Sequence, residues 1–282
     1  MKSNMRIAQL AAAVLLTAAA LPSLAATTWT RSDGTCAAVG DGSAMGNSCK
    51  ATKDGIEATV RAYSNSDSDS TWATAALTAY SGGFGVNNGK SGSTDPGEGT
   101  NPEHAIDNNG LTDAVLFKFS NSISLSALSI GWSDTDADIS VFAWTGSGAP
   151  INATNNGGTL FGQTAAGMMG GSSGWTLVGN YADVNDLAPS GSGGNLTIST
   201  GVTSSWWLVS AYNANFGGTC TKSSGTEVDK SLCAGNDYFK LLSVTGSVKV
   251  PPPGNQTPEP ASLALVGLAS LGLWAGRRRK QA

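Results

Sequence analysis

The chain has 282 residues, of which 37 are glycine and 13% are charged, and its formal net charge at pH 7 is −4. Residues 26–257 carry 10 Lys and Arg against 19 Asp and Glu, a net charge of −9, because six cations lie in the two terminal segments. This acidic body argues against nucleic-acid binding and against charge-driven adhesion to anionic membranes.

The first 25 residues have the parts of a Sec signal peptide. Lys2 and Arg6 give a positive start, residues 7–21 form an apolar run rich in Ala and Leu, and small residues lead up to Ala25. We therefore predict export through the Sec translocon and cleavage after Ala25 or one residue later. An uncleaved anchor is the alternative, which the short run and the cleavage site disfavour.

Four cysteines in an exported chain predict disulfides. Twelve residues separate Cys36 from Cys49, and twelve also separate Cys220 from Cys233. The matched spacing favours two local bridges, each closing a Gly/Ser-rich loop, the first within residues 27–53. Crossed pairing between the two ends of the chain is the main rival. The spacing does not fit a zinc site, and the chain has one histidine.

The body alternates between short apolar runs and Gly/Ser/Asn-rich stretches, a pattern typical of strands joined by turns. Strands are predicted at residues 56–63, 114–119, 123–132, 138–144, 175–181, 195–200, 206–212 and 238–250. Residues 72–80 are rich in Ala and fit either a strand or a short helix. Residues 64–70 form a turn, and the Gly-rich stretches 82–110 and 146–174 are predicted to be irregular.

The apolar phase changes near Ala127, which predicts either a β-bulge or a twist onto a second sheet. Eight to ten short strands with almost no amphipathic helix indicate an all-β fold. We predict one disulfide-tied domain over residues 26–250, a two-sheet sandwich of jelly-roll-like form. A stiff Pro-rich spacer at 251–257 follows it.

Three carboxylates lie two residues apart at Asp134, Asp136 and Asp138. They could converge on Ca²⁺, which takes six to eight oxygen ligands, but the EF-hand pattern is absent. An exposed acidic turn is the preferred interpretation, so no metal and no cofactor is expected. Residues 107–110, Asp-Asn-Asn-Gly, are interpreted as a turn, with a Ca²⁺ ligand as the weaker alternative.

No catalytic residue is predicted, and we do not expect an enzyme. A Ser–His–Asp triad would have to use His104, and no nucleophile elbow is present. A glycosidase pair of carboxylates stays open because its spacing is spatial. A sugar-stacking platform could use Trp132, Trp144, Trp175, Trp206, Trp207, Tyr181 and Tyr212, although most such aromatics fill a core.

The carboxyl end of the chain has three parts in order. Pro258, Glu259 and Pro260 form an extended tripeptide. Residues 261–276 are uncharged and would span about 24 Å as a helix, a short membrane span. Four cations follow, Arg277, Arg278, Arg279 and Lys280, which favour the cytoplasmic side. A plain tail anchor is the alternative interpretation.

These three parts together, residues 258–282, resemble the PEP-CTERM sorting signal of Gram-negative bacteria. The resemblance implies recognition by exosortase, a membrane-embedded cysteine protease or transpeptidase. It also implies transient anchoring in the inner membrane, removal of the tail, and delivery to the cell surface or the extracellular polysaccharide matrix.

The body also resembles a family of exosortase-dependent surface proteins, in residues 102–110, 125–132, 175–181 and 237–241. That family has no assigned chemistry. We therefore expect an exported structural or interaction protein without catalysis, and a carbohydrate-binding module, with or without Ca²⁺, is the alternative. Extracellular polysaccharide is a candidate partner.

Overall fold

The computed structural model describes residues 25–38, 43–44, 46–65, 71–89, 104–150, 160, 163–187, 193–218, 232 and 235–248. In this part of the chain, strands dominate and the only α-helix is the four-residue α1 (Ala165–Met168). The all-β prediction is therefore confirmed. Residues 25–249 form a compact unit.

The strands, in chain order, are β1 (Thr27–Thr30), β2 (Ser43–Ala44), β3 (Ser48–Lys53), β4 (Ile56–Asn65), β5 (Trp72–Thr74), β6 (Ala76–Tyr80), β7 (Gly83–Asn87), β8 (Ile106–Asp107), β9 (Asp113–Thr135), β10 (Ile139–Trp144), β11 (Trp175–Tyr181), β12 (Gly194–Thr197), β13 (Ser204–Ala211) and β14 (Asp237–Val248). Short 3₁₀ turns occur at η1 (Gly34–Ala38), η2 (Val184–Leu187) and η3 (Ala214–Phe216).

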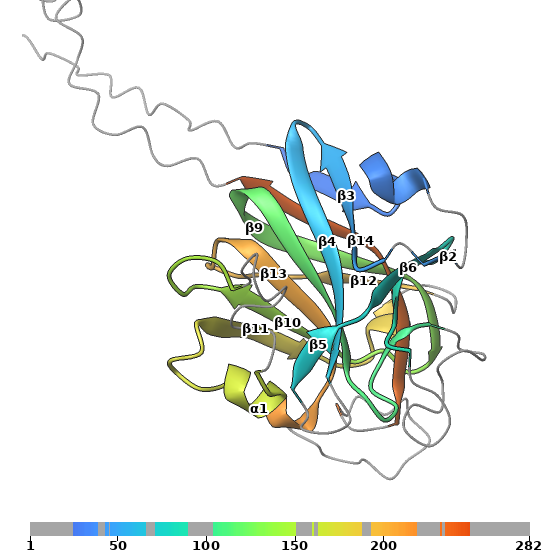
Figure 1. Cartoon of the computed structure of the whole chain (residues 1–282), viewed down its shortest axis with the longest axis vertical. Helices are drawn as coiled ribbons and strands as arrows, with labels where there is room; N and C mark the ends of the chain where they lie inside the picture. Colours follow the sequence, from blue (N-terminus) through green and yellow to red (C-terminus); the bar gives the residue numbers. More distant parts are fainter. Residues whose placement is uncertain are drawn as a thin grey trace, which may run out of the picture. The chain divides into compact units, whose positions relative to one another are not determined.

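The other strands are arranged around β9, the longest strand (Figure 1). As far as Phe119 it pairs antiparallel with β4 on one side and with β13 on the other. From Ile123 onward it pairs with β14 and, at residues 127–130, with β12. The exposed residues 120–122 separate the two parts. β9 thus joins two groups of strands within one antiparallel network.

Each group extends away from β9. In the first group, β10 follows β13 and β11 follows β10, while β3 and β5 both pair with the edge of β4 that faces away from β9. In the second group, the far side of β14 pairs with β1, β7 and β8, and β7 leads on to β6 and β2. The two-layered, jelly-roll-like form stays a prediction. The strand pairing is compatible with it.

A hydrophobic core is shared by the two groups. Its buried members include Phe117 and Trp207 from the first group and Leu128 and Phe239 from the second. A smaller aromatic cluster covers the opposite side of the first group. It includes Trp206 and Phe142, and α1 contributes Met168. Because successive side chains of a strand point to opposite faces, the adjacent Trp206 and Trp207 enter different clusters.

Residues 72–80, whose sequence fits either a strand or a short helix, form two strands. Other segments differ from the prediction. The stretch 82–110, expected to be irregular, contains β7 and β8. Its glycines serve close backbone approach, because a Cβ at Gly83 would lie 2.4 Å from Leu241 and one at Gly85 would lie 1.9 Å from the His104 oxygen. The expected loop at 27–53 includes β1 and β3.

The β-bulge predicted near Ala127 is confirmed. Ala127 faces Thr245 across the ladder and Leu125 faces Gly246, so Ser126 has no opposite residue. One extra residue in a strand reverses the face on which the following side chains lie. This accounts for the change of apolar phase in the sequence.

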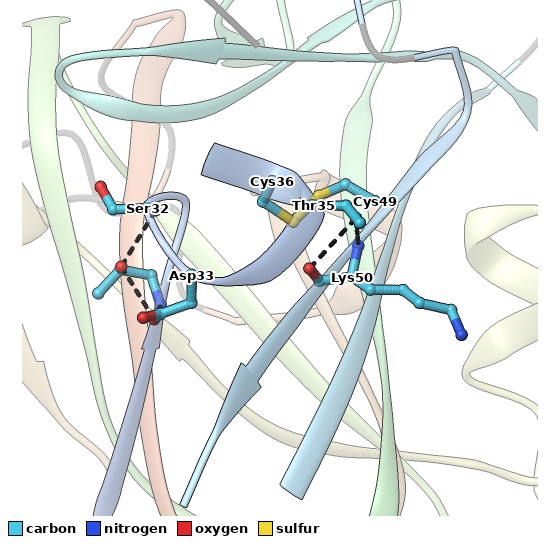
Figure 2. The surroundings of a disulfide bond; sticks show 7 residues. Ser32, Asp33, Thr35, Cys36, Cys49 and Lys50 are labelled. Carbon is cyan, nitrogen blue, oxygen red and sulfur yellow. Dashed lines mark hydrogen bonds between the residues drawn. A yellow bond between two sulfur atoms is a disulfide. The ribbon is translucent and has the colours of Figure 1, made fainter. Parts of the chain in front are cut away.

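A disulfide joins Cys36 of η1 to Cys49 of β3, as local pairing predicts (Figure 2). Thr35 supports the same junction, since its hydroxyl accepts from the Lys50 N–H at 2.9 Å and donates to the Lys50 carbonyl at 3.3 Å. Both sulfur-bearing side chains are buried. The second predicted pair, Cys220 and Cys233, lies outside the described residues.

The first and last described strands are neighbours. β1 pairs antiparallel with the end of β14, with Thr27 opposite Gly246. The two ends of the β domain therefore lie close together. The opposite end of β14 begins at Asp237, which pairs with Thr135 at the end of β9.

Candidate functional site

Three buried aspartates meet where β9 ends and β14 begins. Asp136 and Asp138 lie in the short connection from β9 to β10, and Asp237 is the first residue of β14. One carboxylate oxygen from each lies within 4.8 Å of those of the other two. The three side chains, which we call the acidic cluster, are only 8%, 1% and 2% exposed. The expected exposed acidic turn is thus wrong for Asp136 and Asp138.

The backbone explains why Asp134 is not part of the acidic cluster. Thr135 has a φ of 58°, in the left-handed region that β-branched residues rarely adopt. Its hydroxyl donates to the Asn236 carbonyl at 3.1 Å, which ties this turn to the start of β14. The strand therefore ends before the two-residue alternation reaches Asp136, and Asp134 remains only partly buried.

Backbone N–H groups orient the carboxylates. Asp237 Oδ1 accepts from the Asp138 N–H at 2.7 Å, and Asp138 Oδ1 accepts from the Asp183 N–H at 2.8 Å. Asp136 Oδ1 accepts from the next N–H along the chain, that of Ala137, also at 2.8 Å. These contacts fix three different segments of the chain around one point.

Asn108 connects the acidic cluster to the loop before β9. Its amide nitrogen donates to Asp237 Oδ2 and, at 2.9 Å, to the Tyr212 carbonyl. Its side-chain oxygen accepts from the Asp237 N–H at 2.8 Å. Asp107 beside it accepts from the Asn109 N–H at 3.0 Å, so residues 107–110 form the predicted turn.

Burial and mutual repulsion raise the pKa values of Asp138 and Asp237. Burial raises the pKa of Asp138 to about 7, the Asp183 N–H opposes this rise, and the Asp136 and Asp183 carboxylates add to it. Burial, followed by the Asp138 carboxylate, also raises the pKa of Asp237 well above its usual value. Within the part of the chain that the structure describes, no lysine or arginine contributes to either shift. The acidic cluster favours either bound protons or a bound cation.

A polar cavity of about 360 Å³ adjoins the acidic cluster. Polar side chains dominate its wall, which is formed by Asn65, Asn108, Gly110, Thr112, Tyr212, Asn213, Ala214, Leu232 and Gly235. Asn65 accepts from the Thr112 N–H, and Asn213 donates to the Thr112 hydroxyl at 2.8 Å. Asn108 lines the cavity and is hydrogen-bonded to Asp237, so it connects the cavity with the acidic cluster.

Comparison with protein families identifies the carboxyl end of the chain. A family model described as the PEP-CTERM protein-sorting motif matches residues 256–280. The chain carries a PEP-CTERM sorting motif. This motif implies an exported protein that is anchored transiently and processed by exosortase. No curated protein and no solved structure matches the chain.

The residues predicted to act in sorting lie outside the described residues. These are the Pro258–Glu259–Pro260 tripeptide and the four cations from Arg277 to Lys280, which fall within the PEP-CTERM match. Across the described ranges, no helix has the length and apolar character of a bilayer span. The predicted span at 261–276 falls outside those ranges.

The other functional candidates of the sequence are the aromatic residues and His104. Trp144, Trp175, Trp206, Trp207 and Tyr212 are buried, so the proposed sugar-stacking platform is wrong for these five. His104 lies 3.3 Å from the Asn87 amide nitrogen through its Nε2.

Sequence reasoning missed Asp237 as a member of the acidic cluster. It lies ninety-nine residues beyond Asp138, and no local spacing relates the two. The available signal was an acidic residue at the first position of a strongly apolar closing strand.

Proposed function

We propose that the chain is a non-enzymatic protein of the cell surface or extracellular polysaccharide matrix, in which the β domain has a structural or interaction role. The PEP-CTERM match at residues 256–280, outside the compact unit 25–249, is the observation that carries this proposal. The sequence offers no catalytic constellation. A disulfide suits an oxidising, extracytoplasmic environment.

In this proposal, each terminal segment has one step in export and processing. The signal peptide directs export through the Sec translocon, residues 261–276 hold the chain in the inner membrane, and the cations at 277–280 fix its orientation. β14 ends at Val248, so residues 249–257 separate it from Pro258. Nine residues reach at most about 30 Å when extended, enough to separate the Pro-Glu-Pro region from the domain.

Intact-mass analysis of the released protein tests this proposal. We expect one product that begins after Ala25 or Ala26 and lacks the carboxyl-terminal segment. An exosortase-deficient strain of the same host should retain the full tail on a membrane-bound form. Recovering mainly full-length carboxyl termini from the surface of exosortase-positive cells would contradict the proposal.

The polar cavity favours carbohydrate binding as a second candidate function. Its asparagine and threonine side chains are groups that recognise sugar hydroxyls. Of the residues that the structure describes, none that lines it is charged, which suits a neutral glycan.

A glycan array with and without EDTA tests the second function. Asn65→Ala and Asn213→Ala should weaken binding to any glycan found. Asn195→Ala is the matched control, because Asn195 is an exposed residue of β12 outside the cavity wall. Failure to bind any glycan, or equal losses in all three variants, would argue against this site.

A further inference from the structure

We infer that Asp136, Asp138 and Asp237 bind one divalent cation, and that this cation is Ca²⁺. The inference concerns the β domain and does not depend on the proposed sorting route. It assigns a metal site that joins the β9–β10 connection to the first residue of β14.

The dimensions of the acidic cluster fit a single hard cation. Ca²⁺ is bound by oxygen ligands at about 2.3–2.6 Å, so two ligands on opposite sides lie about 4.6–5.2 Å apart. The three carboxylate oxygens all lie within 4.8 Å of one another. One ion can therefore contact all three without separating the strands.

Asp138 provides an independent reason to expect a ligand. It is almost completely buried, and its Oδ1 accepts one hydrogen bond, from the Asp183 N–H. Among the described residues, this N–H is the one hydrogen-bond donor to the Asp138 side chain. A buried carboxylate that accepts a single hydrogen bond is costly, and metal coordination is one of the arrangements that satisfies it.

Three lysines in the described ranges make contacts away from the acidic cluster. Lys50 pairs with Glu57, and Lys53 approaches Asp33. Lys240, three residues after Asp237, places its ammonium 3.9 Å from the centre of the Tyr80 ring and 4.8 Å from that of Trp132. The nearest cation along β14 therefore packs against aromatic rings.

Ligand chemistry selects Ca²⁺ among common divalent ions. The three donors are carboxylate oxygens, which hard cations prefer, whereas zinc favours nitrogen and sulfur ligands. Ca²⁺ also tolerates irregular ligand arrangements better than Mg²⁺, which requires near-octahedral geometry. Water and backbone carbonyls would complete the six to eight positions.

A bound Ca²⁺ would also affect the polar cavity. Asn108 accepts from the Asp237 N–H and lines the cavity, so fixing Asp237 fixes this part of the cavity wall. Removing the ion would loosen both features together.

The test uses the full-length protein purified in detergent, stripped of metal with EDTA and dialysed into metal-free buffer. Titration calorimetry with CaCl₂ should show one ion bound per chain, and thermal unfolding should show a higher Tm with Ca²⁺. A stripped wild-type protein that binds no Ca²⁺ and shows no Tm change would overturn the inference without any variant.

Two substitutions locate the ion. Asp138→Asn removes one ligand charge with almost no change of shape and should weaken Ca²⁺ binding at least tenfold. Asp134→Asn is the matched control, because Asp134 lies on the same segment but outside the acidic cluster, and it should bind like the wild type. Equal losses in the two variants would place the ion elsewhere and refute the assignment. Asp237→Asn replaces Asp138→Asn if that variant does not fold.

Discussion

Replacing both Cys36 and Cys49 by alanine should destabilise the β domain by about 3 kcal/mol, the chain-entropy value for a closed loop of about 14 residues. The two cysteines are 13 positions apart, and the bridge joins η1 to β3. Alanine is preferable to serine because both sites are buried, and a buried hydroxyl would add its own cost.

Urea unfolding followed by tryptophan fluorescence measures this loss under oxidising conditions. For a domain of this size, about 3 kcal/mol corresponds to a fall in Tm of roughly 6–12 °C. Thr35→Ala is the control, since it removes the hydrogen bonds to Lys50 and leaves the disulfide intact. A loss below about 1 kcal/mol for the double variant, the scale of one hydrogen bond, would refute the reasoning.

Three further outcomes are expected. Trp207→Ala empties a fully buried site in the shared core and should lower the free energy of unfolding in urea by about 3–5 kcal/mol. Trp132 is half-buried, so Trp132→Ala should lower it clearly less, and equal losses would contradict the assigned packing. Without metal, stability should fall as pH rises from about 4 to 7, because Asp138, with a folded-state pKa of about 7 against 3.8 unfolded, then holds more protons folded than unfolded. The rise in Tm on adding Ca²⁺ should therefore be larger at pH 8 than at pH 5, and a pH-independent rise would argue against binding at these carboxylates. Replacing Arg277, Arg278, Arg279 and Lys280 with glutamine should impair membrane retention and sorting in cell fractionation while leaving urea unfolding unchanged; normal surface delivery with tail removal would refute the role given to these cations.

Local alternation was sufficient to predict most of the strands. The run at residues 175–181 coincides with β11, and the phase change near Ala127 reports a real bulge. These features depend on neighbours in sequence, since side chains of a strand alternate between two faces. The PEP-CTERM motif was equally readable because it is a contiguous signal.

Features set by distant contacts could not be read in this way. Gly83 and Gly85 indicated a loop, yet they lie in β7 because the backbones of Leu241 and His104 approach them closely. Likewise, the spacing of Asp134, Asp136 and Asp138 suggested that these three carboxylates could converge. The backbone at Thr135 separates Asp134 from the other two, and Asp237, from the other end of the domain sequence, takes its place.

The position of β14 determines how the domain would respond to mechanical force. Its carboxyl end leads to the sorting segment, and the strand is paired with β9 along its length and with β1 at its end. Antiparallel hydrogen bonds lie perpendicular to the strands, so a pull along β14 loads many of them at once, in shear. A tether attached at this end would therefore pull on one of the most extensively paired strands of the domain and not on a peripheral hairpin that could unzip bond by bond.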